Sequence, residues 1–83
     1  MSEISRFYGI IIYMYSFDHN PPHIHVRYGE KESIFYINKL TFESSMPEKI
    51  EKRVVMWVTL HLKEILHNWE LGQEGKMLVK IKP

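Results

Sequence analysis

The 83-residue sequence contains no cysteine. Disulfide scaffolds, thiolate zinc sites and cysteine nucleophiles are therefore excluded as explanations of its fold or chemistry. Long hydrophobic runs are also missing, because the longest apolar stretch, residues 9–15, is far shorter than the roughly 20 residues of a membrane-spanning helix. The first residues show no secretory signal. We therefore expect a cytoplasmic protein that does not associate with membranes.

The sequence also lacks a strong excess of either charge. Eleven Lys and Arg residues face ten Asp and Glu residues, which gives a net charge of +1, well below the basic balance of a dedicated nucleic-acid binder. Lys76, Lys80 and Lys82 crowd the C-terminal end, as a solvated tail or as a contact for phosphate or a partner. The length and the 45% hydrophobic content predict a single globular domain over residues 1–83.

The first half of the sequence has the pattern of β-strands. Residues 4–15 are rich in β-branched and aromatic side chains and predict one central strand. Residues 23–28 alternate, with Ile24 and Val26 on one face and the histidines on the other. A turn and a returning strand should follow, and a register that pairs Val26 with Phe35 would join apolar positions.

The second half changes to a helical pattern. Apolar residues spaced by three and four predict one helix over residues 47–70, with Pro47 in its first turn and a stop near Gly72. Short extended pieces are expected at residues 39–43 and 77–81. The predicted fold class is α+β: a small antiparallel sheet of three to four strands with one long C-terminal helix packed on one face.

One segment is chemically unusual, the run Asp18-His19-Asn20-Pro21-Pro22-His23-Ile24-His25. His23 and His25 are two positions apart, so on a strand both imidazoles project from the same side, with Cβ atoms roughly 6–7 Å apart. Such a pair can converge on one ion or one substrate group. The two prolines stiffen the loop that presents Asp18 and His19.

The cluster admits three interpretations. Asp18 can cap the turn while His23 and His25 are partly exposed strand residues without a chemical role. If the alanine variants of both histidines unfold, the histidines are structural. Two histidines and a carboxylate are also a known ligand set for zinc or non-haem iron, so His23 and His25 are the alternative metal ligands, although a third ligand at a familiar spacing is not evident. The lead hypothesis is metal-free acid–base chemistry without a cofactor, with Asp18, His19, His23 and His25 as the catalytic residues. It predicts that alanine at either strand histidine removes activity with little change in stability.

Two further residues are candidates for binding roles. Arg6 stands among aromatic residues early in the first strand, where a guanidinium can hold a phosphate or carboxylate. His61 projects onto the apolar face of the predicted helix, where a neutral imidazole needs a hydrogen-bond partner. Asp18, His19 and Asn68 are the expected partners, and a bond to Asp18 would make His61 a brace of the loop.

The sequence resembles a small prokaryotic family known as "domain of unknown function 4160". The resemblance lies in the motif Asp-His-x-Pro-Pro-His-x-His over residues 18–25, in residues 4–10 before it, and in Trp57 and residues 68–69 after it. The resemblance implies a bacterial or archaeal protein that is often encoded beside a second small protein. Such pairs look like type II toxin–antitoxin modules, with this family in the toxin role. The family pattern points at Asp18, His19, His23 and His25, and less firmly at Arg6, without an established target or reaction.

The function expected from these observations is that of a toxin-like protein that cleaves RNA without a metal ion. One histidine would accept the 2′-hydroxyl proton and another would protonate the leaving oxygen, while Arg6 or Lys80 holds the phosphate. The alternative is a non-catalytic binding module that pairs with a small antitoxin-like neighbour. A metal-dependent hydrolase is the third hypothesis. A homodimer is left open.

Overall fold

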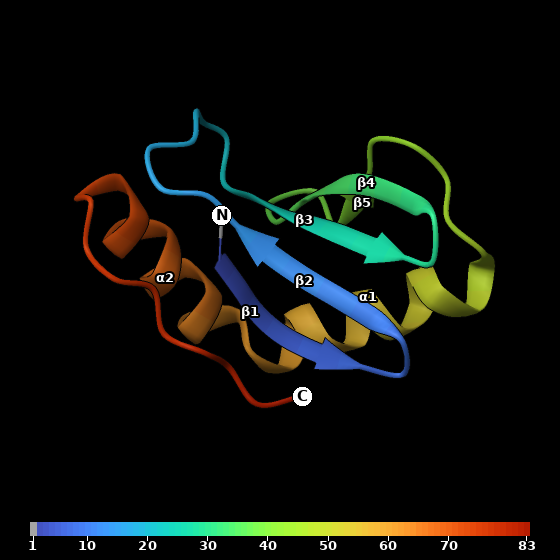
Figure 1. The fold of residues 1–83 in the computed structure, drawn as a ribbon. Helices are drawn as coiled ribbons and strands as arrows, with labels where there is room; N and C mark the ends of the chain where they lie inside the picture. The colour runs from blue at the N-terminus through green and yellow to red at the C-terminus, as the bar shows by residue number, and fades with distance from the viewer. Residues whose placement is uncertain (1) are drawn as a thin grey trace.

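A computed structural model describes residues 2–83 and contains one antiparallel sheet followed by two helices (Figure 1). The strands lie in the sheet in chain order, and their bounds are β1 (Ser2–Phe7), β2 (Ile10–Met14), β3 (His23–Tyr28), β4 (Lys31–Tyr36) and β5 (Thr41–Phe42). The predicted α+β class is confirmed. The described residues form five strands and two helices, so the prediction of three to four strands and one long helix was wrong in detail.

The additional strand arises because residues 4–15 form a hairpin instead of one strand. Tyr8 and Gly9 make its turn with φ angles of 51° and 78°, and Phe7 pairs with Ile10 on either side of it. Two consecutive residues of positive φ are what a two-residue type I′ turn requires. Gly9 and Tyr8 therefore reverse the chain within the segment that was predicted to be one strand.

The pairing of β3 with β4 differs from the predicted register by two residues. Ile24 pairs with Phe35, and Val26 pairs with Ser33. The reason is the turn: only two residues lie between Tyr28 and its partner Lys31, and so tight a turn pairs Val26 with a residue earlier than Phe35. A shift of two residues keeps every side chain on its face, so Ile24 and Val26 are still fully buried in the core.

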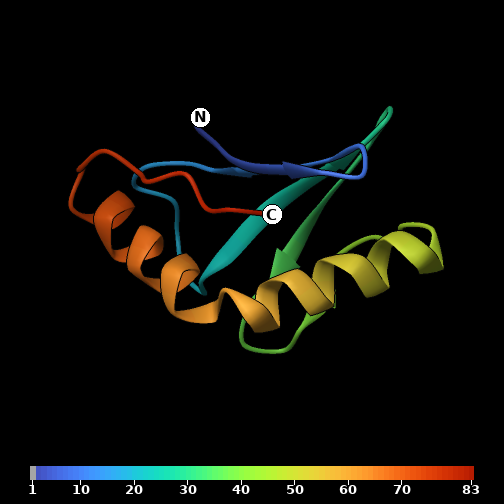
Figure 2. The same cartoon turned by 90° about the horizontal axis from the view of Figure 1, so that it is seen from below.

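The predicted single helix is divided at His61. Helix α1 (Glu48–Leu60) and helix α2 (Leu62–Gln73) flank this residue, whose φ of −111° and ψ of 24° are not helical. A straight helix of that combined length would measure about 39 Å, which exceeds the molecule's longest dimension of 34 Å. Figure 2 shows that the break turns α2 toward one end of the sheet and that both helices cover the same sheet face. In residues 2–83, no helix covers the opposite face.

The core lies between the inner sheet face and the helices. Ile12, Phe35, Val54 and Ile65 are completely buried there. Residues 77–81 do not form the predicted edge strand. They follow β1 as a tail, and the amide of Ile81 donates a hydrogen bond to the Ile4 carbonyl at 2.7 Å (Figure 1). Of the two helices described, neither has the length and apolar character to cross a membrane.

Candidate functional site

The loop between β2 and β3 is held in place by the end of α2. The amide of Phe17 donates a hydrogen bond to the Gly72 carbonyl at 3.0 Å, and Nε2 of Gln73 donates to the Asp18 carbonyl at 2.7 Å. The helix thus anchors the backbone on both sides of the Phe17–Asp18 peptide. This anchoring fixes where the Asp18 carboxylate points.

The Asp18 carboxylate joins the two histidines of β3. Its Oδ2 atom lies 2.9 Å from Nε2 of His23 and 3.2 Å from Nε2 of His25. Both imidazoles therefore project from the same side of the strand, which confirms the geometric prediction. The residue that the sequence could only place nearby, Asp18, stands between them.

His23 is buried and fully engaged, with 3% of its side chain exposed. Its Nδ1 lies 2.8 Å from the Pro21 carbonyl, and since a carbonyl only accepts, Nδ1 carries the proton. The ring packs against Trp69 of α2 at a centroid distance of 5.2 Å and near Tyr36 of β4. The expectation that His23 is an exposed strand residue was wrong, because α2 bends over the start of β3.

The cluster opens to solvent on the side of His25. The His25 side chain is 17% exposed, that of Asp18 is 14% exposed, and Tyr15 packs edge-on against the His25 ring at 4.4 Å. His19 stands outside, with a side chain that is 90% exposed and Nδ1 at 3.3 Å from Asp18 Oδ1. His19 therefore lies at the mouth of the cluster.

The electrostatics of the cluster keep Asp18 ionised. Burial by itself would raise the pKa of the carboxyl, but hydrogen bonds from His25, from the backbone amide of His19 and from His23, with the charge of His23, lower the pKa below its usual value. An ionised carboxylate flanked by two imidazoles is an acceptor for protons or for a cation. The positions of the carboxylate and the two imidazoles are compatible with either proton transfer or cation binding.

The three side chains also lie close enough together to hold a metal ion. One ligand atom from each of Asp18, His23 and His25 lies within 4.8 Å of the other two. In a tetrahedral zinc site with bonds of about 2.0–2.1 Å, ligand atoms are about 3.3 Å apart. Movements of about an ångström would suffice to place all three atoms around one ion. The third ligand missed in the sequence is Asp18, five residues before His23.

Arg6 and His61, the predicted binding residues, are not part of the cluster. Arg6 forms an ion pair with Glu3 at 2.8 Å and lies on β1, two strands from β3 in the sheet order. Nδ1 of His61 lies 2.8 Å from Oε1 of Glu64, so the prediction of Asp18, His19 or Asn68 as its partner was wrong. The helix break places His61 beside its own next turn instead of against the loop.

Lys80, the other predicted phosphate ligand, also lies near β1. Its charge contributes to lowering the pKa of Glu3, after the larger effects of Arg6 and burial. Neither predicted cation therefore has a contact with the cluster among the interactions of residues 2–83.

Sequence reasoning missed a cation that lies closer to the histidines. Arg27 follows His25 by two residues on β3, so it shares the outer face of the sheet. It is exposed, and its Nη1 donates a hydrogen bond to the Tyr13 hydroxyl at 2.9 Å. The alternation of residues 23–28 already placed Arg27 on the histidine face, and this was the available signal.

Comparison with known proteins gives one result. The model of a protein family described as "Domain of unknown function (DUF4160)" matches residues 9–70, which is about three quarters of the chain and includes the whole Asp/His cluster. No curated protein and no solved structure matches the chain significantly.

Proposed function

Since the chain belongs to the DUF4160 family, whose function is unknown, we propose from the site itself that Asp18, His23 and His25 bind a divalent metal ion and that the protein hydrolyses phosphate esters. The observation that carries this proposal is the convergence of Oδ2 and two imidazole nitrogens within 4.8 Å. Two histidines and one carboxylate are a recurrent ligand set of catalytic zinc and iron(II) sites.

The hydrogen bond of His23 to Pro21 supports a ligand role. Metal-binding histidines commonly donate their second ring N–H to a backbone carbonyl, which fixes the tautomer and aims the other nitrogen at the ion. Nδ1 of His23 has this bond at 2.8 Å, while Nε2 points at Asp18. With both nitrogens engaged inside the protein, His23 offers none to a substrate, so it is better suited to hold an ion than to transfer substrate protons.

The partial exposure of the site leaves room for a reaction. Three protein ligands leave a further position for water or substrate, and the exposed side lies at His25 and Asp18. A bound divalent ion would polarise a phosphoryl oxygen and make a bound water easier to deprotonate. His19, at the mouth, is placed to exchange protons with a group that enters.

The substrate class is inferred from Arg27. A guanidinium pairs well with phosphate, and Arg27 lies two residues from His25 on the sheet face that points away from α1 and α2 (Figure 2). We propose single-stranded RNA as the substrate class. Arg27→Met should raise KM for RNA about tenfold with a smaller change in kcat, because it removes a binding contact and no ligand of the ion.

Metal-free acid–base catalysis is the second candidate. The sharing of one Asp18 oxygen by two imidazoles favours it, because a carboxylate stabilises imidazolium and orients the ring. In this version His25 and the exposed His19 would transfer protons, since both His23 nitrogens are engaged. Metal dependence separates the two candidates.

The test measures metal content and hydrolysis in the same preparations. Purified protein is stripped with a chelator, reloaded with zinc, manganese or iron(II), and assayed on a fluorescent single-stranded RNA. We expect activity only in the reloaded protein, with Asp18→Asn and His25→Gln inactive and metal-poor. His67→Gln, an exposed histidine of α2, is the matched control and should behave as the native protein.

Other results would change the assignment. Full activity after stripping, with loss in His25→Gln, would support the metal-free reaction and refute the metal centre. Metal binding without hydrolysis would leave a structural ion and refute the hydrolase. For the cell, we propose the toxin-like role that the family resemblance implies: expression should slow growth, and His25→Gln should relieve the effect. A non-catalytic binder would still slow growth with the His25→Gln variant.

A further inference from the structure

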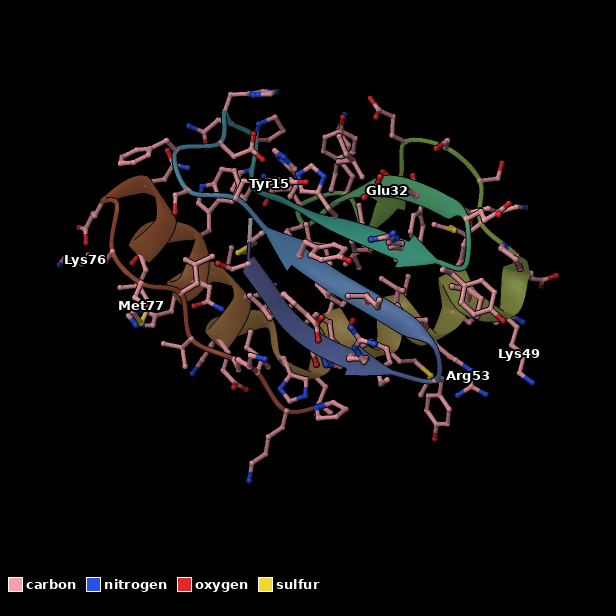
Figure 3. The ribbon with its side chains drawn as sticks, in the orientation of Figure 1. Tyr15, Glu32, Lys49, Arg53, Lys76 and Met77 are labelled. Carbon is pink, nitrogen blue, oxygen red and sulfur yellow. The ribbon has the colours of Figure 1, made fainter. Side chains whose placement is uncertain are left out.

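A second surface of the molecule is separate from the Asp/His cluster. It is a groove of about 930 Å³ between the β1–β2 turn and the outer side of α1. Figure 3 labels Arg53 and Lys49 beside this groove and Tyr15 beside the cluster, well apart in the view. The groove therefore has no part in the chemistry proposed above and needs an explanation of its own.

The floor of the groove is apolar and exposed. Met56 and Leu60 of α1 are 72% and 75% exposed, and Tyr8 of the turn is 75% exposed. Phe7 and Trp57 complete the floor and stack on each other at 5.3 Å. Contiguous exposed apolar side chains of this size on a soluble domain mark a binding surface, and methionine adapts readily to the shape of a partner.

The rim of the groove carries positive charge only. Lys49, Lys52 and Arg53 line it, and no acidic residue is among the described lining residues. Lys52 has an exposed ion pair with Glu48 at 3.3 Å, a contact that contributes little and is easily exchanged. Apolar side chains framed by cations complement a partner that presents apolar side chains framed by carboxylates.

We propose that this groove binds an acidic amphipathic helix of a partner protein. Helix α1 has 13 residues and is about 20 Å long, so its outer ridge matches a partner helix of three to four turns. In helix-in-groove binding the partner helix inserts apolar residues spaced by three and four positions. Met56 and Leu60, which are four positions apart on α1, offer an apolar surface for such residues. The flanking glutamates or aspartates of the partner would face Lys49, Lys52 and Arg53.

Two other occupants fit less well. A second copy placed by two-fold symmetry would bring the cationic rim against itself. A nucleic-acid strand would meet the cations but few free aromatic faces, because Arg53 already covers the Tyr8 ring at 3.8 Å and Phe7 stacks on Trp57. The acidic helix satisfies both the floor and the rim.

A displayed peptide library tests the proposal. Helical peptides of about 14 residues carry leucine at positions spaced by three and four and Glu, Lys or Ser elsewhere. Peptides that bind the full-length protein are selected, and peptides that also bind the Met56→Glu/Leu60→Glu variant are removed. We expect the enriched peptides to be rich in Glu, and their affinity to fall about tenfold or more in that variant and in Lys49→Glu/Lys52→Glu.

Met77→Glu is the matched control, because Met77 is 90% exposed and lies on the opposite side of the molecule (Figure 3). It should leave peptide affinity unchanged. If the Met56→Glu/Leu60→Glu protein does not fold, the lysine variant decides alone. The proposal would be overturned by enrichment of Lys-rich peptides or by no enrichment at all. It would also be overturned if the native protein forms a dimer that the groove variants dissociate, or binds RNA in a way that the groove variants remove.

Discussion

Replacing Asn68 by alanine should loosen the C-terminal tail and lower stability markedly. Asn68 lies on α2 and is 1% exposed. Its Nδ2 donates to the Val79 carbonyl at 2.7 Å, and the Val79 amide donates to its Oδ1 at 2.8 Å. One side chain thus supplies both bonds that a neighbouring strand would give to residue 79.

The magnitude follows from these two bonds and from the tail that they hold. Each hydrogen bond contributes about 0.5–1.5 kcal/mol net, so the pair contributes about 2 kcal/mol. The tail also carries Ile81, which is 5% exposed, and the Lys82 carbonyl that accepts from Nε1 of Trp57 at 3.1 Å. Exposing Ile81 would add about 1.5–3 kcal/mol if the tail detaches completely.

The assay is equilibrium unfolding in urea with a thermal scan. We expect Asn68→Ala to lose about 2–3 kcal/mol, which corresponds to a fall in Tm of roughly 8–24 °C for a domain of this size. His67→Ala, the exposed neighbour on the same helix, should change stability by less than about 0.5 kcal/mol. Equal behaviour of the two variants would refute the view that Asn68 holds the tail.

Three further predictions follow from the site and the loop. His23→Ala should lower the free energy of unfolding by about 2 kcal/mol or more, because it removes a buried ring and two hydrogen bonds. His25→Ala should lower it by less than about 1 kcal/mol. Equal losses of the two variants in urea unfolding would contradict the observed difference in burial. Zinc at about 100 times its Kd should stabilise the native protein by about 2.7 kcal/mol and raise its Tm by roughly 10–20 °C. The Tm of Asp18→Asn should not change, and an unchanged native Tm at saturating zinc would argue against the proposed metal centre. Gly75→Ala should cost about 1 kcal/mol, because Gly75 has a φ of +71° and its added Cβ would stand 2.6 Å from the Phe17 ring; an unfolding curve that overlays the native one would show that the loop relaxes freely.

The sequence predicted what depends on short-range pattern. Alternation placed Ile24 and Val26 in the core and both histidines on the other side of β3, and a two-residue error in register could not change that assignment. The spacing of apolar residues predicted the helical half. The division at His61 could not be predicted in this way, because residues 58–64 contain neither proline nor glycine.

The parts that were missed depend on contacts between distant segments. Trp69 is buried, as the spacing of apolar residues along the predicted helix indicates, but the contact of its ring with His23 depends on where α2 lies. Asn68 was predicted only as a partner of His61, and Gln73 was given no partner, because the groups that they bind are backbone atoms of the tail and the loop. The hairpin at Tyr8–Gly9 was missed because a tyrosine in the left-handed region is uncommon.

The positions of the cluster and the groove limit how one could influence the other. A partner helix in the groove would contact α1, whereas the cluster rests on α2 through Trp69 and Gln73. The two helices meet at His61, whose amide closes α1 and whose carbonyl accepts the first bond of α2 from Ile65. A partner confined to the groove would leave His25 and Asp18 open to solvent, so control of activity would have to pass through this junction as a change in the tilt of α2. In the Trp57→Phe variant, where Trp69 is the one remaining tryptophan, fluorescence and hydrolysis should then change together when a Glu-rich peptide binds.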